Sequence, residues 1–154
     1  MPGPPTPEAA FQGTVTDALT ALGWVWDHTY PLRTRDGWRT GSTLKGKPDL
    51  IALKPPIELA IELKAEDGVL AEEQRAVLSM YAQLPHARAW VLRSTMPWAM
   101  ITSWLQDPQA APRVHGFAPM TRVEAKRVID LSRLRRPRSR RGSTGGQLGL
   151  QLPE

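Results

Sequence analysis

Two short apolar runs separated by a pair of prolines place the strongest constraint on how this chain can fold. The segment from residue 46 to residue 64 reads GKPDLIALKPPIELAIELK. Each run is of strand length and rich in aliphatic residues, which favours buried strands over helices. Pro55-Pro56 forces a turn between the runs. We therefore predict strands at 49–53 and 57–64.

Three charged residues occupy these otherwise apolar strands. Asp49 opens the first strand, and Glu62 and Lys64 share one face at the end of the second. If the strands pair through the proline turn, the two acids meet at one edge of the sheet. Adjacent carboxylates repel each other unless a cation lies between them. Oxygen ligands that leave room for water suit Mg²⁺ or Mn²⁺, and the lysine could place or deprotonate a water there.

Two other interpretations use the same region. A salt bridge between Asp49 and Lys64, with Glu62 in solvent, requires no metal but accounts poorly for three charges in apolar strands. The sequence GSTLKGK at 41–47 matches the start of a phosphate-binding P-loop. A P-loop continues with Ser or Thr and then a helix, whereas this chain has Pro48 and a predicted strand, which argues against nucleotide binding.

The remaining pattern predicts one α/β domain built around a mixed sheet. A hairpin is expected around Asp36-Gly37, with strands near 25–34 and 38–43. A further strand is expected at 88–94, and a loop is expected at 106–120. Apolar periodicity and capping residues predict helices at 7–22, 70–84, 97–105 and 121–134. On the third of these helices, Trp98 and Trp104 are expected to pack in the core.

The charge of the chain is concentrated at one end. Residues 1–132 hold 14 Lys plus Arg and 14 Asp plus Glu, whereas residues 133–154 hold six Arg and one Glu. The whole net charge of +5 therefore lies in this segment, which we predict to be a disordered tail. It is either a solvated end or an arm that contacts phosphates. Residues 1–5 are predicted to be a flexible lead-in.

Composition excludes several classes of protein. The chain has no cysteine, and hence no disulfide framework or thiolate metal site. No apolar run is long enough to span a bilayer, and the N-terminus lacks the pattern of a secretory signal. We therefore expect a cytoplasmic protein that does not enter a membrane. A cluster of basic residues around Trp38 could contact nucleic acid: Arg33, Arg35, Arg39, Lys45 and Lys47.

Taken together, GKPDLIAL, AIELK and GVLAEEQ resemble the PD-(D/E)xK nuclease superfamily, most closely the small, phage-type proteins of its VRR-NUC branch. The resemblance covers residues 6–105, within a predicted nuclease domain at 6–132. It implies a restriction-endonuclease-like core, in which helices flank a mixed β-sheet. Beyond residue 106 there is no resemblance.

The resemblance also implies roles for individual residues. Asp49, Glu62 and the backbone carbonyl of Leu63 would bind Mg²⁺ or Mn²⁺, and Lys64 would act on the attacking water. Gln74 would steady the site from the following helix. In a further role, Glu8 would hold a metal-bound water or a second ion. The chain departs from the family pattern at Ala71, where Ser or Thr is common, and at Leu78, where a related group has Tyr.

The activity implied is a metal-dependent endonuclease that hydrolyses DNA phosphodiester bonds and leaves 5′-phosphate and 3′-hydroxyl ends. The family is linked to branched DNA such as flaps and Holliday junctions, and junction cleavage requires two sites and hence a homodimer. One alternative is a non-catalytic DNA-binding protein on the same scaffold. Another is a sequence-specific restriction-type endonuclease, for which residues 106–132 are the remaining place for a base-reading element.

Overall fold

The computed structural model describes residues 3–35, 37–40 and 43–135. Most of the predicted tail lies outside these ranges. The helices and strands follow one another along the chain as α1 (Pro7–Ala21), β1 (Val25–His28), β2 (Pro31–Thr34), β3 (Gly37–Thr40), β4 (Leu50–Lys54), β5 (Ile57–Lys64), α2 (Glu72–Ala82), β6 (Ala87–Arg93), α3 (Trp98–Gln106), β7 (Val114–His115) and α4 (Arg122–Leu134).

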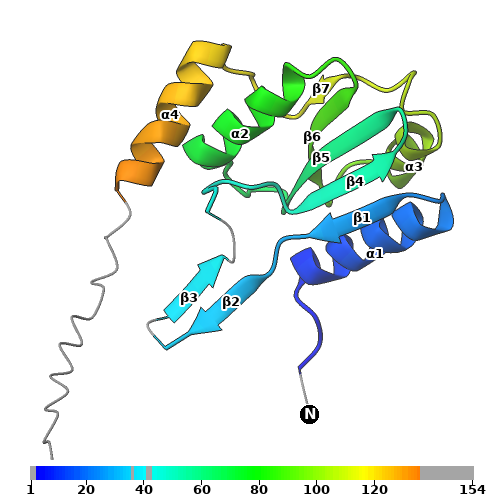
Figure 1. The fold of residues 1–154 in the computed structure, drawn as a ribbon. Helices are drawn as coiled ribbons and strands as arrows, with labels where there is room; N and C mark the ends of the chain where they lie inside the picture. The colour runs from blue at the N-terminus through cyan, green and yellow to red at the C-terminus, as the bar shows by residue number, and fades with distance from the viewer. Residues whose placement is uncertain (1–2, 36, 41–42, 136–154) are drawn as a thin grey trace, which may run out of the picture.

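Five of the strands form one mixed sheet in the order β1-β4-β5-β6-β7. The β1-β4 and β4-β5 pairs are antiparallel, and the β5-β6 and β6-β7 pairs are parallel. Helix α2 makes the crossover between the parallel strands β5 and β6, as such a connection requires. The chain is therefore an α/β protein with helices flanking a mixed sheet (Figure 1), which confirms the predicted fold class.

The two faces of the sheet are covered by different helices. Along β5, Leu59, Ile61 and Leu63 face α1 and α3 and form the main core with Trp90 of β6. The opposite face packs against α2 through small side chains such as Ala60, and small residues let the helix approach the sheet closely. Helix α4 lies outside α2, so the molecule has an additional helical layer on that side (Figure 1).

Several predicted boundaries agree closely with the structure. Strand β5 occupies residues 57–64 as predicted. Helix α1 begins after Thr6, whose hydroxyl accepts a hydrogen bond from the N–H of Ala9, and Pro7 is its first residue. Thr121 and Glu124 form a capping box at the start of α4.

Other predictions were wrong. The expected hairpin of 25–34 with 38–43 is divided: β1 is an edge strand of the main sheet, and only β2 and β3 pair with each other. Within the predicted loop, β7 adds a short parallel strand next to β6. The predicted tail begins two residues too early, because Arg133 and Leu134 belong to α4.

Two further points concern helices. Trp104 packs against the core as expected, but Trp98 is 39% exposed because it lies in the first turn of α3, at the surface. In the described part of the chain, no helix has the length and apolar character needed to cross a membrane.

Candidate active site

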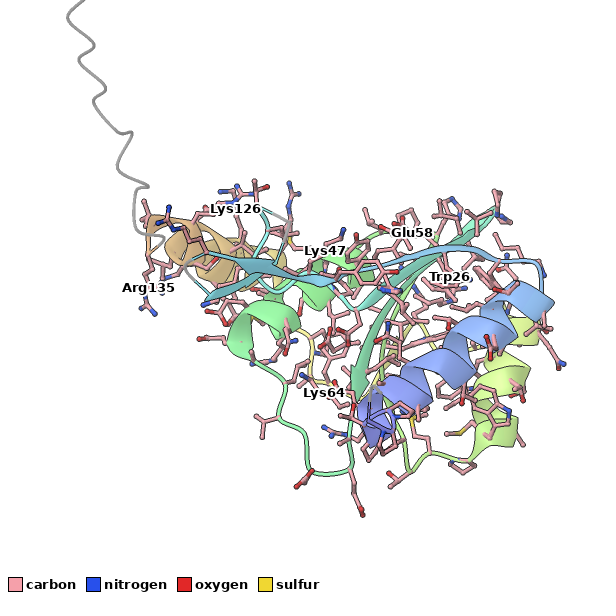
Figure 2. The ribbon with its side chains drawn as sticks, turned by 90° about the horizontal axis from the view of Figure 1, so that it is seen from below. Trp26, Lys47, Glu58, Lys64, Lys126 and Arg135 are labelled. Atoms are coloured by element: carbon pink, nitrogen blue, oxygen red, sulfur yellow. The ribbon has the colours of Figure 1, made fainter. Side chains whose placement is uncertain are left out.

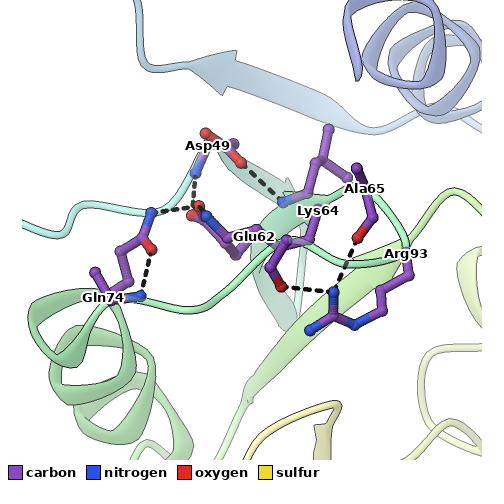
Figure 3. A network of polar contacts seen from close by, with 9 residues as sticks. Asp49, Glu62, Lys64, Ala65, Gln74 and Arg93 are labelled. Carbon is purple, nitrogen blue, oxygen red and sulfur yellow. Dashed lines mark hydrogen bonds and ion pairs between the residues drawn. The ribbon is translucent and has the colours of Figure 1, made fainter. Parts of the chain in front are cut away.

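The register between β4 and β5 brings the two predicted acids together. Leu50 lies opposite Ile61, so Asp49 and Glu62 are neighbours at the end of the strand pair. The N–H of Asp49 donates to Oε2 of Glu62 at 3.2 Å, and the N–H of Leu63 donates to Oδ2 of Asp49 at 2.8 Å (Figure 3). The sheet backbone therefore holds both carboxylates in fixed positions.

Pro48 interrupts the hydrogen-bond ladder next to these acids. The register would place residue 48 opposite Leu63, where the two backbones would exchange hydrogen bonds. Proline has no N–H and so cannot donate to the carbonyl of Leu63. The N–H and C=O of one strand residue point to the same side, so this carbonyl faces Asp49 along with the N–H that binds it. Proline thus leaves the carbonyl oxygen of Leu63 without this ladder hydrogen bond, on the side of β5 that faces β4.

Glu62 is buried, with only 2% of its surface exposed. Its Oε1 accepts a hydrogen bond from Nε2 of Gln74 at 2.5 Å and lies 3.3 Å from Nζ of Lys64. The alternative of a solvated Glu62 with a salt bridge between Asp49 and Lys64 is therefore not what the structure shows. The lysine pairs with the glutamate on its own strand instead.

Burial and mutual repulsion make these carboxylates hard to ionise in the absence of a cation. Loss of solvent, followed by the negative charge of Asp49, raises the pKa of Glu62 to about 8, although Lys64 acts in the opposite direction. Burial also raises the pKa of Asp49, while its hydrogen bond from Leu63 lowers it. The charge of Glu8, in the first turn of α1, adds to the increase in the pKa of Asp49.

The N-terminus of α2 is tied to this pair of acids. Gln74 uses both ends of its amide: Nε2 binds Glu62, and Oε1 accepts the N–H of Ala71 at 2.9 Å. The N–H of Ala71, at the N-cap of α2, is therefore satisfied from the third helical position, although the alanine side chain provides no cap. The partial positive charge of the helix N-terminus also points toward the carboxylates.

The loop before β4 packs directly on this helix end. Gly46 has φ +84°, and a Cβ atom at this position would lie 2.4 Å from the backbone carbon and oxygen of Glu73. Only glycine tolerates this conformation and this contact together. Nearby, Lys45 pairs with the side chain of Glu73 at 3.1 Å. The Gly-x-Pro-Asp segment is thus held against the residue that precedes Gln74.

Sequence reasoning missed Arg93, at the end of β6 next to Lys64. Its Nη1 lies 2.9, 3.2 and 2.8 Å from the carbonyl oxygens of Ala65, Glu66 and Gly68. This arginine therefore holds the loop that follows the candidate catalytic lysine (Figure 3). The parallel pairing of β5 with β6 was the signal that could have found it, since residues 64 and 93 lie side by side in that register.

The predicted basic residues are only partly brought to the site. Lys45 and Lys47 line a pocket of about 320 Å³ together with Asp49 and Gln74. Arg35 is exposed in the turn between β2 and β3. Arg33 and Arg39 lie on β2 and β3, and their side chains, like that of Trp38, are outside the described part of the structure.

The donor set fits a hard divalent cation with few protein ligands. The two carboxylates and the carbonyl of Leu63 are all oxygen donors, which Mg²⁺ and Mn²⁺ prefer, and Mg²⁺ commonly takes one or two carboxylates plus waters. Among the residues that the structure describes, no three His, Cys, Asp or Glu side chains gather closely enough to hold an ion. Glu8 is exposed on the first turn of α1, and its part in holding a metal-bound water or a second ion stays a prediction.

No protein-family profile and no curated protein matches this chain.

Proposed function

We propose that this protein is a Mg²⁺- or Mn²⁺-dependent nuclease of the VRR-NUC type that hydrolyses DNA phosphodiester bonds. One observation carries the proposal: Asp49 and a buried Glu62 lie side by side, with Lys64 3.3 Å from the glutamate. Burial of two acids against each other costs stability, and such an arrangement is typical of sites that bind cations or perform catalysis.

Each residue has a distinct part in the reaction. Asp49, Glu62 and the carbonyl of Leu63 would hold the cation, which when bound supplies Lewis acidity toward a phosphate oxygen. Lys64 is 16% exposed, so its ammonium can hold the attacking water while it stays next to Glu62. Water attacks phosphorus and loses a proton to solvent, the bond to the 3′ oxygen breaks, and that oxygen takes up a proton from solvent. The products are a 5′-phosphate and a 3′-hydroxyl.

Gln74 and Arg93 support these groups without touching the substrate. Gln74 fixes the orientation of the Glu62 carboxylate, and Arg93 fixes the loop that begins directly after Lys64. Lys47 lines the pocket beside Asp49, where it can contact the phosphate backbone of DNA. Positioning residues of this kind matter because small displacements of reacting groups are costly in rate.

A cleavage assay with matched variants tests the proposal. Labelled four-way junction, 5′ flap, single-stranded and linear duplex DNA are incubated with Mg²⁺ or Mn²⁺, and DNA binding is measured separately in Ca²⁺. Lys64→Ala should bind DNA but cut it at least about 100-fold more slowly. Glu58→Gln is the control, because Glu58 lies on the same face of β5 at its opposite end (Figure 2) and should cut normally.

Two outcomes would contradict the proposal. If the wild-type protein binds DNA but cuts none of the substrates, the protein is a binding module on a nuclease scaffold. If Lys64→Ala cuts as fast as the wild type, the site is not where the chemistry occurs.

Binding of Mn²⁺, followed by electron paramagnetic resonance, gives a readout that does not depend on cleavage. Wild type and Glu58→Gln should bind the ion, and Glu62→Gln should not. Preference for a four-way junction would further require a homodimer, which size-exclusion chromatography with light scattering would detect.

A further inference from the structure

Three exposed aliphatic side chains lie along the outer face of helix α4. Val123 is 79% exposed, Leu131 43% and Leu134 80%, and their spacing places them on one side of the helix. The opposite side of the helix packs on α2, where Ala125 is fully buried. In the described part of the chain, α4 therefore forms the outermost layer on this side, and its apolar outer face is open to solvent (Figure 1).

Charged residues of both signs lie among these aliphatic side chains. Lys126, Arg127 and Asp130 line one shallow depression together with the three aliphatic residues, and we call these six residues the α4 stripe. Within the helix, Nζ of Lys126 lies 2.5 Å from Oδ2 of Asp130. A carboxylate has two oxygens and accepts from more than one donor, so Asp130 can also receive a cation from outside the helix.

A twofold axis across the middle of α4 brings the aliphatic residues of two copies together. With the helices antiparallel and the axis level with residues 128–129, Val123 of each copy lies opposite Leu134 of the other. By the same symmetry, Lys126 lies opposite Leu131, and its aliphatic stem can cover the leucine while its ammonium stays in water. The α4 stripe of one copy thus shields that of the other from solvent.

The same axis also pairs opposite charges. Arg127 of each copy lies opposite Asp130 of the other, so two ion pairs form across the axis. A parallel arrangement would place each Arg127 against its own copy, which is unfavourable. Antiparallel helices of 13 residues also keep the two Arg135 residues about 20 Å apart, where salt screens their repulsion.

We infer that the α4 stripe is an interface between two copies of this protein, related by a twofold axis and with their α4 helices antiparallel. The inference goes beyond the proposed nuclease function and does not rest on it, because the contact requires neither metal nor DNA. The stripe faces away from α2, so the contact leaves Asp49 and Glu62 uncovered in both copies. One helix of 13 residues from each copy makes a smaller contact than the roughly 1,600 Å² of a standard interface, so the dimer should dissociate on dilution.

Sedimentation velocity of the metal-free protein, from roughly 1 μM to roughly 300 μM, tests the inference. Wild type should pass from monomer to dimer as its concentration rises. Arg127→Asp and Asp130→Arg each place like charges opposite one another, so each should weaken self-association at least about tenfold. The double variant Arg127→Asp/Asp130→Arg exchanges the two charges and should dimerise as wild type does.

An equimolar mixture of the two single variants tests the antiparallel arrangement directly. Arg127→Asp has two acids at these positions, and Asp130→Arg has two arginines, so a mixed pair is complementary at both contacts. The mixture should form a heterodimer at concentrations where neither variant pairs with itself. Added salt should weaken this heterodimer, because its ion pairs are close to solvent.

Two matched controls separate the α4 stripe from general effects of substitution. Arg122→Asp makes the same charge change on the same helix, but Arg122 lines the groove between α2 and α4 and should leave self-association unchanged. Val123→Ser should weaken the dimer without altering its ion pairs, whereas Val69→Ser, at an 84% exposed valine in the loop before α2, should not. Circular dichroism checks that each variant keeps its helices.

A wild-type protein that stays monomeric up to roughly 300 μM overturns the inference and assigns the α4 stripe to a partner of another kind. Single variants that dimerise as wild type does, or a mixture that forms no heterodimer, overturn it as well. Failure of the proposed function is a separate result, in which wild type cuts no DNA in Mg²⁺ or Mn²⁺ whether or not it dimerises.

Discussion

Gln74 joins Glu62 to the N-terminus of α2 through the two ends of one amide group. Its Nε2 donates to the carboxylate at 2.5 Å, and its Oε1 accepts the N–H of Ala71 at 2.9 Å. A single side chain thus orients the buried acid and caps the helix.

The double role of Gln74 predicts a combined loss of stability and activity. Gln74→Ala leaves the Ala71 N–H without its cap and Glu62 with one donor fewer, so we expect a loss of about 1–3 kcal/mol in the free energy of unfolding. Urea denaturation measures this change, and cleavage should slow in parallel. Gln83→Ala, at the exposed C-terminal end of the same helix, should change neither quantity. Equal stability of the two variants would contradict the role described.

Gly46 predicts a sharp difference between two glycine substitutions. Gly46→Ala introduces a Cβ 2.4 Å from the Glu73 backbone at φ +84°, and should cost about 2 kcal/mol or more. Gly13→Ala is the matched control in α1, where a Cβ would meet nothing within 4 Å. Alanine has the higher helix propensity, so this variant should be more stable by about 0.5–1 kcal/mol. Thermal unfolding of both variants gives the comparison, and a Gly46→Ala protein as stable as wild type would show that the loop can move away from α2.

The pKa of Glu62 predicts how stability without metal depends on pH. Because its pKa is raised from 4.5 to about 8 in the folded state, the folded protein holds a proton that the unfolded chain releases. The contribution of Glu62 to the free energy of unfolding is therefore fully present below pH 4.5 and is lost as the pH rises to about 8. Asp49 shifts in the same direction.

The measurement is the melting temperature in EDTA at pH 5.5 and at pH 8. For wild type we expect it to be lower at pH 8 by at least about 4 °C, since one pKa unit corresponds to about 1.4 kcal/mol. Glu62→Gln cannot ionise and should reduce this difference, and Mg²⁺ should restore stability to wild type at pH 8. A wild-type protein that is more stable at pH 8 than at pH 5.5 in EDTA would refute the assignment.

We expect the Arg93→Ala substitution to slow DNA cleavage without weakening DNA binding. Arg93→Ala removes the donor to the carbonyls of Ala65, Glu66 and Gly68, so the loop after Lys64 should open. Hydrogen exchange at residues 65–68 should become faster, and cleavage should slow about tenfold because the lysine is less well placed. Arg113→Ala is the control, since that arginine donates to Leu84 away from the site. Unchanged exchange in the loop would argue against the positioning role of Arg93.

The strand pair around the proline turn could be predicted because its information is local. Pro55-Pro56 and two apolar runs specify β4 and β5, and the two-residue period places Glu62 and Lys64 on one face. The capping residues Thr6 and Thr121 likewise specify where α1 and α4 begin, since a cap acts within one helical turn.

The errors came from features that depend on distant parts of the chain. The segment from Val25 to His28 has the alternation of a hairpin strand, but it pairs with β4 because that edge of the main sheet was available. The two residues of β7 form a strand only because β6 lies beside them.

The sequence by itself determined β4 and β5, the helices and the placement of two acids and a lysine on these strands, because propensity, periodicity and capping act over a few residues. Only the tertiary structure decided which groups meet. The contact of Asp49 with Glu62, the contact of Gly46 with α2, the hydrogen bonds of Arg93 to the loop and the bond of Thr29 to Asp49 all depend on strand register and helix packing. These contacts join residues far apart in the chain, and they form only when burial of the shared core brings the elements together.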